Sequence, residues 1–176
     1  RNRLWGLWHA HIGWILDLEL TNTVLYGKDL LRDPILTYIN KYYFWWLFIG
    51  LVIPAIIGGV LANTWTGFLS GFLWGGIIRL FLAQQITYFV NSLCHVFGSR
   101  PFRTSDRSTN IGWLAPLTFG GSWHNNHHAF PNTAINQFRW WQIDFGGWVM
   151  RVLEMLGLAW DVKRPTIEMI KAKKAI

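Results

Sequence analysis

Four histidines at two places in the chain are the residues best suited to chemistry. His124, His127 and His128 form an H-x-x-H-H pattern, and His95 follows Asn91 by four residues. On a helical turn, residues at positions i, i+3 and i+4 lie on nearly one face, so the three imidazoles of the first group can share a metal ion. Imidazole nitrogens without thiolates suit iron, copper or zinc. The pattern therefore predicts a histidine-rich metal site.

Each of these signals also has a simpler explanation. A histidine at a helix end, such as His95, is more often a capping or interfacial residue than a ligand, and Asn91 alone most often joins two helices in a membrane. A short histidine-rich loop can simply be solvated. His9 and His11 lie in a Trp-rich apolar segment, where we expect polar tips at the level of the lipid headgroups. The single cysteine, Cys94, excludes an internal disulfide framework and a multi-cysteine zinc site.

The elements that must position these residues begin with two apolar segments. Across residues 42–99 the only charged residue is Arg79, whereas about a quarter of the residues in a soluble domain are charged. The stretch is long enough for two membrane-spanning helices of about 20 residues each, which we expect at about 43–62 and 65–92. The short break between them implies an antiparallel hairpin, with His95 just after the second span. A charge inside a membrane marks either a functional residue or a packing contact.

Basic residues flank both ends of this hairpin, and its turn carries no charge. The positive-inside rule therefore places both flanks in the cytoplasm, and we expect an integral membrane protein whose active site faces the cytoplasm. Thirteen tryptophans suit a chain that lies at membrane–water interfaces. This topology and anionic lipid explain the net charge of +7 better than nucleic acid does, because no nucleic-acid-binding motif accompanies the charge.

The predicted fold is an all-α integral membrane protein, in which a cytoplasmic helical cap on a transmembrane helical hairpin carries the histidine-rich metal site. Its parts are interfacial and cytoplasmic helices at 1–42, the two spans within 43–95, the cap with the histidine box at 96–162 and a basic tail at 163–176. Asp144 can begin a helix in the cap, and Gly157 can end it. We also expect short helices near Leu4–Leu16 and Asp33–Lys41, and a frayed tail.

Three segments in order carry a resemblance to a known family. They read Asn91-Ser92-Leu93-Cys94-His95, then Arg100-Pro101-Phe102, then Gly120-Gly121-Ser122-Trp123-His124-Asn125-Asn126-His127-His128-Ala129-Phe130-Pro131. Together they resemble the membrane fatty acyl desaturases of the delta-9 (stearoyl-CoA desaturase-like) group. Near the start of the chain, Trp8-His9-Ala10-His11-Ile12-Gly13-Trp14 resembles a segment that follows the second histidine box of that family.

The resemblance implies a di-iron enzyme that uses O₂ and two electrons to introduce a cis double bond, expected at the delta-9 position, into a saturated acyl chain. Thr87 and Tyr88 match a pair that lines the bend of the acyl tunnel, with Tyr in place of Trp. The implied partners are a fatty acyl-CoA or acyl-lipid substrate, the lipid bilayer and an electron donor of the ferredoxin, rubredoxin or cytochrome b5 type. The implied metal-binding residues are His95, His124, His127, His128 and, through water, Asn91.

The sequence departs from the family in two ways. The two earlier histidine boxes of the family are not in this chain, which opens Arg-Asn-Arg without Met. We therefore expect an N-terminally truncated chain of a bacterial member, which cannot complete a two-iron site by itself. Asp17 and Glu19 stand where animal members carry an Arg-Lys pair that meets the acyl-CoA headgroup. Carboxylates repel CoA phosphates, so the acyl carrier (CoA, acyl carrier protein or lipid) stays open.

Two other functions compete with desaturation. A hydroxylase of the same membrane superfamily can use the same oxidant, and Tyr88 is the kind of change that could shift the outcome. A non-catalytic relative that kept the fold and lost the site is the third possibility. The double-bond position, chain length and oligomeric state are not set by the sequence.

Overall fold

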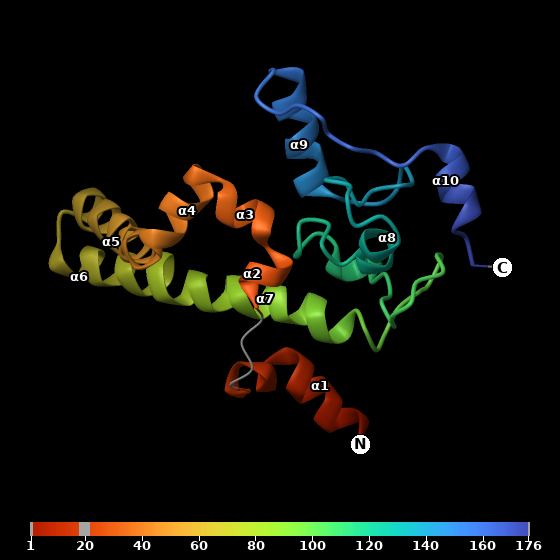
Figure 1. Ribbon diagram of the computed structural model, residues 1–176. Helices are drawn as coiled ribbons and strands as arrows, with labels where there is room; N and C mark the ends of the chain where they lie inside the picture. Colours follow the sequence, from red (N-terminus) through yellow and green to blue (C-terminus); the bar gives the residue numbers. More distant parts are fainter. Residues whose placement is uncertain (1, 18–21, 176) are drawn as a thin grey trace. The chain divides into compact units, whose positions relative to one another are not determined.

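The structure is a computed structural model that describes residues 2–17 and 22–175 (Figure 1). The chain forms two compact units. One unit combines the N-terminal residues up to Leu16 with the chain from Gln85 onward, and the other unit contains the residues between them. Within the described ranges the regular elements are all helical, as predicted, and the remaining pairing consists of isolated bridges between single residues.

The unit between Leu16 and Gln85 contains the first of the two long apolar helices that the composition predicts and most of the second. The first is α5 (Tyr43–Ala62), and the second is an uninterrupted helical run over Trp65–Leu93. Both are long and apolar enough to cross a membrane. These bounds agree closely with the predicted spans. The elements are α2 (Thr23–Tyr26), α3 (Lys28–Arg32), α4 (Pro34–Lys41), α5 (Tyr43–Ala62), α6 (Trp65–Ser70), the π-helical η2 (Gly71–Ile78) and the start of α7 (Arg79–Leu93).

A tight turn joins the two long helices. Asn63 adopts a left-handed conformation with φ of 49°, and the Thr64 hydroxyl accepts the N–H of Gly67 at 3.0 Å, which caps α6. Glycine then allows the backbones to approach closely, because a Cβ at Gly71 would lie 2.2 Å from the carbonyl oxygen of Pro54. Close contact through small residues is typical of helix pairs in membranes.

Arg79 supports the backbone of this hairpin. Pro54 has no N–H, so the carbonyl of Gly50, four residues earlier, lacks its usual helical donor. The Arg79 guanidinium donates to this carbonyl at 3.0 Å and to the carbonyl of Gly75 at 2.6 Å. Arg79, the single charged residue in the apolar stretch, thus supplies the hydrogen-bond donor that Pro54 cannot offer to the Gly50 carbonyl. Of the two roles expected for Arg79, the contacts favour packing.

The other unit is built from shorter helices and long loops. Asp144 accepts the N–H of Gly147 at 2.8 Å at the start of α9, and Gly157 follows α9 with φ of 70°, so both predicted ends of this helix are confirmed. The elements are α1 (Arg3–His11), η1 (Gly13–Leu16), the end of α7, η3 (Gly112–Leu114), α8 (His124–Ala129), α9 (Phe145–Met155) and α10 (Ile167–Ala172).

Both short helices predicted in the N-terminal segment are present, and the structure adds two more helices between them. α1 with η1 covers the segment predicted near Leu4–Leu16, and α4 follows Asp33, whose carboxylate accepts the N–H groups of Ile35 and Leu36. α2 and α3 were not predicted, because helices this short carry too few apolar repeats to show a period.

The basic tail is not frayed, contrary to the prediction. Ile170 on α10 packs against the apolar cluster of Phe102, Ala129 and Phe130. The N–H of Ala175 donates to the carbonyl of Pro101 at 2.9 Å. Burial of an apolar side chain and extended backbone pairing hold the tail in place, and neither could be inferred from its lysine content.

Candidate metal centre

Three histidines converge in the unit that contains α8. One ligand nitrogen from each of His95, His124 and His128 lies within 4.8 Å of the other two. The Nε2 atom of His124 is 3.0 Å from that of His95 and 3.0 Å from that of His128. His95 lies in the turn after α7, whereas the other two lie on α8. The chain thus brings together residues from both places that the sequence singled out.

The spacing of these nitrogens fits one shared metal ion. Two imidazole nitrogens bound at about 2.1 Å and at right angles to each other lie about 3.0 Å apart, which matches both Nε2 separations. The donors are imidazoles without a thiolate, a set that suits iron, zinc or copper. The cluster could therefore hold a metal ion of the kind predicted, with these nitrogens as part of its ligand set.

His127 does not join this cluster. Its ring centroid lies 6.0 Å from that of His124, and its nitrogens are outside the group of three. At about 100° per residue, positions i+3 and i+4 diverge by about 100° around a helix, so His127 and His128 leave α8 on different sides of His124. The expectation that all three imidazoles of the H-x-x-H-H pattern point one way is therefore wrong for His127 in this structure.

A buried asparagine outside α8 holds the start of this helix. The Oδ1 atom of Asn110 accepts the backbone N–H groups of Asn125 and Asn126 at 2.9 and 3.2 Å. The Nδ2 atom of Asn110 donates to Asn126 Oδ1 at 2.7 Å. These bonds satisfy N–H groups that a helix start leaves free. Asn110 thereby sets where α8 begins and how its histidines face.

A second asparagine ties the same helix to the loop of the Arg-Pro-Phe motif. The backbone N–H of Phe102 donates to Asn125 Oδ1 at 2.8 Å, and Asn125 Nδ2 donates to the carbonyl of Phe102 at 3.2 Å. Asn125 is fully buried. The Arg-Pro-Phe motif and the histidine box are therefore parts of one polar network, which explains physically why they occur together.

Asp106 orients one of the three histidines. A carboxylate oxygen of Asp106 pairs with Nδ1 of His128, which leaves Nε2 of that ring to face the cluster. Burial tends to raise the pKa of Asp106, but hydrogen bonds from Ser108 and Thr104 and the charge of His128 outweigh it and hold the pKa well below its usual range. A carboxylate that fixes the tautomer of a histidine is the usual support of a metal ligand.

Burial favours the neutral form of three imidazoles in this region, those of His95, His124 and His127. The pKa of His124 is lowered to about 3, first by burial and then by the neighbouring His128, His95 and His127. Burial is also the main cause that lowers the pKa of His95 and of His127. A neutral imidazole offers its lone pair to a metal without first losing a proton. These groups are therefore ready to bind a cation at neutral pH.

The other predicted site residues lie on α7. Thr87 and Asn91 are exposed and one turn apart on the helix, and Tyr88 is half-buried. The ring of Tyr88 packs edge-on against those of His11 and Trp14, at centroid distances of 5.8 and 6.1 Å. Their assignment to an acyl tunnel and to a metal-bound water stays a prediction.

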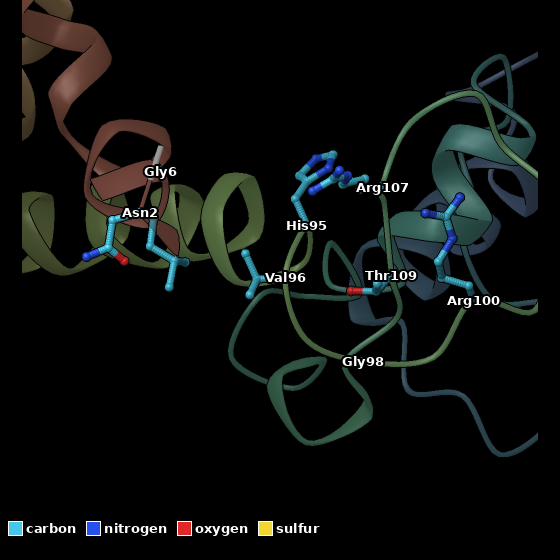
Figure 2. A pocket seen from close by; sticks show the side chains of 9 residues that line it. Asn2, Gly6, His95, Val96, Gly98, Arg100, Arg107 and Thr109 are labelled. Atoms are coloured by element: carbon cyan, nitrogen blue, oxygen red, sulfur yellow. The ribbon is translucent and has the colours of Figure 1, made fainter. Parts of the chain in front are cut away.

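A cavity of about 610 Å³ opens beside His95 (Figure 2). Asn2 and Gly6 of the α1 region line one side, and Arg100 and Arg107 belong to the loop that lines the other. Arg100 itself is bound to this loop, since it donates to the carbonyl of Asp106 at 2.6 Å. The cluster of three histidines thus borders open space on the side of His95.

Sequence reasoning missed Asp106 and Asn110. The pair Asn125-Asn126 between the histidines was a signal for buried amides, but their partner at position 110 is set by a long-range contact. Nothing local distinguishes Asp106 from other surface aspartates.

Comparison with known proteins places these features in a family. The model of the fatty acid desaturase family matches residues 2–162. The chain is 47% identical to the hex-5-enoyl-[acyl-carrier protein] acetylenase of Moorena producens (strain JHB), over 96% of this chain and 53% of that protein. It is 38% identical to delta-9 acyl-lipid desaturase 1 of Arabidopsis thaliana, over 92% of this chain and 51% of that protein. It is 35% identical to the sn-1 stearoyl-lipid 9-desaturase of Anabaena variabilis, over 90% and 56%.

The chain spans about half the length of these curated relatives. The family model covers most of the chain, including both long apolar helices and all three clustered histidines. The chain belongs to the fatty acid desaturase family.

Proposed function

We propose that the enzyme containing this chain is an O₂-dependent di-iron fatty acyl desaturase that introduces a cis double bond, at the delta-9 position, into a saturated acyl chain. The observation that carries the proposal is the convergence of three Nε2 atoms from His95, His124 and His128 in a member of the fatty acid desaturase family. Iron bound there supplies, with O₂ and external electrons, the oxidising power that an unactivated C–H bond requires.

The reaction balances with one acyl chain and one O₂. Two adjacent C–H bonds break and one C=C bond forms, which removes two electrons and two protons from the substrate. O₂ takes these two electrons and two more from an external donor, and with four protons it becomes two molecules of water. An electron-donor protein is therefore a necessary partner, of the ferredoxin, rubredoxin or cytochrome b5 type.

Residues of this chain divide the work of holding the metal and the substrate. His95, His124 and His128 bind one iron, and Asp106 keeps a proton on Nδ1 of His128 so that its Nε2 stays a ligand. A second iron requires further ligands, of which His127 and, through water, Asn91 are two. Thr87 and Tyr88, one turn or less from Asn91 on α7, line the acyl tunnel.

The setting is the lipid bilayer. In this proposal α5 and the helical run that ends in α7 span the membrane, for which both are long and apolar enough. Their outer ends lie in the cytoplasm, which the basic residues on both flanks favour. The domains are then the interfacial helices at 1–42, the spans within 43–95, a cytoplasmic cap at 96–162 and a basic tail at 163–176. The active site faces the cytoplasm, where a soluble electron donor can reach it.

A second candidate follows from the relative at 47% identity. That protein is named as an acetylenase of a hex-5-enoyl chain on acyl carrier protein, so the same chemistry applied to an existing C=C bond gives a triple bond. Asp17 and Glu19 argue against a CoA headgroup at this position. Relatives of this chain are named for acyl chains on acyl carrier protein or on lipid, so these two are the favoured carriers for either reaction.

The test is product analysis with the native gene product that contains this chain, in membranes with an electron donor. Deuterated stearoyl chains on lipid, CoA and acyl carrier protein, and a terminal alkenyl chain on acyl carrier protein, are supplied separately. We expect an alkene that has lost two deuterium atoms from adjacent carbons, identified by mass spectrometry. An alkyne from the alkenyl substrate alone would favour the acetylenase.

The His128→Ala variant, which lacks one of the three clustered imidazoles, is the negative control for this experiment. It should insert into the membrane and yield no product, because one of three converging nitrogens is gone. A hydroxy acid as the main product of the unaltered enzyme would replace desaturation by hydroxylation. Full turnover by His128→Ala would refute the metal site.

A further inference from the structure

His11 lies outside the metal cluster, yet both of its ring nitrogens are bonded to α7. Nδ1 is 3.0 Å from the hydroxyl of Ser92, and Nε2 is 3.0 Å from Oε1 of Gln85. The ring also lies against Phe89 and edge-on to Tyr88, at centroid distances of 4.8 and 5.8 Å. These four contacts with α7 differ from the expectation that His11 presents its polar tip to the lipid headgroups.

The bonding pattern of Ser92 gives the contact a direction. The Ser92 hydroxyl donates to the backbone carbonyl of Tyr88 at 2.7 Å, so its oxygen accepts from Nδ1–H of His11. Gln85 can present either its oxygen or its amide nitrogen to Nε2. We refer to the two hydrogen bonds between His11 and α7 as the clamp.

The face of α7 that His11 binds adjoins the face assigned to the metal and substrate. At about 100° per residue, Gln85, Tyr88 and Ser92 form one stripe along the helix. Thr87 and Asn91 form the neighbouring stripe, and Tyr88 borders both. A rotation of α7 by one residue would turn Asn91 away by about 100°, and the two hydrogen bonds to His11 oppose that rotation.

We propose that His11 is a positioning residue, which fixes the rotation of α7 and the ring of Tyr88 and thereby sets which methylenes of the acyl chain face the metal. The inference rests on the proposed function. His11 is not one of the three clustered histidines, and it acts through Gln85, Ser92 and Tyr88. Trp14, whose ring lies 6.1 Å from that of Tyr88, closes the other side of the tyrosine.

Two variants test this in the native gene product reconstituted in lipid nanodiscs. His11→Ala removes both hydrogen bonds, and Gln85→Ala removes one. Gln84→Ala is the matched control, because Gln84 is the same residue type, adjacent on α7 and exposed. For each variant the iron content, the KM for the acyl substrate and the distribution of double-bond positions are measured.

We expect His11→Ala to keep its iron and to raise KM roughly five- to tenfold, as the loss of about 1 kcal/mol of hydrogen bonding implies. Its product should be a mixture of neighbouring double-bond positions in place of one. Gln85→Ala should give a smaller change of the same kind, and Gln84→Ala should match the unaltered enzyme. A product distribution and KM unchanged in both His11→Ala and Gln85→Ala would overturn the proposal.

A second readout does not depend on turnover. Hydrogen exchange of the amides over residues 85–93 should be faster in His11→Ala than in Gln84→Ala, because the clamp on this part of α7 is gone. If His11→Ala does not fold, Gln85→Ala alone decides between the outcomes. Equal exchange rates in all variants would refute the clamp. If the unaltered enzyme yields no unsaturated product, the proposed function is refuted. The exchange rates still test the clamp in that case, because they do not depend on turnover.

Discussion

The two units of the molecule bury polar groups by opposite means. In the long helical hairpin a single charged side chain, Arg79, serves a backbone carbonyl that Pro54 leaves without a donor. In the unit around α8, side-chain amides and a carboxylate fill the interior, with Asn110, Asn125 and Asp144 all buried and bonded to backbone groups.

The difference follows from what each unit must hold. The hairpin exposes its apolar side chains, and close backbone contact at glycines gives it shape without a core. The unit around α8 must fix imidazoles from two distant segments at one point, which directional hydrogen bonds do better than apolar packing. Changes in the polar network should therefore lower metal binding, whereas changes at the contact between Arg79 and the Gly50 carbonyl should affect stability alone.

The largest effect is expected for Asn110→Ala. It leaves the buried N–H groups of Asn125 and Asn126 without an acceptor, at a cost of about 3 to 5 kcal/mol of unfolding free energy. Metal bound per protein should fall with it, because α8 loses its fixed start. Thermal unfolding and metal analysis of the purified protein measure both. Asn132→Ala, at an exposed asparagine, should change neither, and normal metal content in Asn110→Ala would contradict the role of the network.

Asp106→Ala should have the next largest effect. Loss of the carboxylate frees His128 to rotate and to change tautomer, and such support of a ligand is worth roughly 10- to 100-fold in metal affinity. Competition with a coloured chelator measures the affinity. Asp29→Ala, at an exposed aspartate on α3, is the control. An affinity unchanged in Asp106→Ala would show that His128 needs no second partner.

The hairpin offers a sharper test of the comparison through a double-mutant cycle. Arg79→Met should lower the unfolding free energy by about 1 to 2 kcal/mol, because the Gly50 carbonyl loses its donor. In a Pro54→Ala background the loss should shrink, since the residue at 54 then has an N–H for that carbonyl. Unfolding in mixed detergent micelles gives the four values. Equal losses in the two backgrounds would mean that Arg79 does not act through the Gly50 carbonyl. A lower metal content in Arg79→Met would contradict the contrast between the two units.

The same contrast explains what could be predicted from the sequence. The two long apolar helices depend on composition over some twenty consecutive residues, and the bounds of these helices were predicted closely. The helix ends at Asp33, Asp144 and Gly157 depend on local capping, and they too were confirmed. These features need no knowledge of distant contacts.

The site could be predicted in its residue types but not in its arrangement. His124, His127 and His128 share one helical turn, and only the approach of His95 from α7 determines that His128 joins the cluster and His127 does not. Asp106 and Asn110 depend on the same long-range contacts. The order of the tail depends on the packing of Ile170 against Phe102, two residues that lie far apart in the sequence.

The smallest expected effect is a pH dependence of the metal-free protein. The pKa of His124 is lowered from 6.5 to about 3 in the folded state, with burial as the first cause. Between these values the unfolded chain binds a proton that the folded chain excludes, so stability is full above pH 6.5 and falls as the pH drops toward 3. The loss from pH 7 to pH 6 should be about 0.5 to 1 kcal/mol. Thermal unfolding of His124→Asn, which lacks the titrating ring, should show a correspondingly weaker pH dependence. A slope that persists undiminished in His124→Asn would show that His124 is not the titrating group.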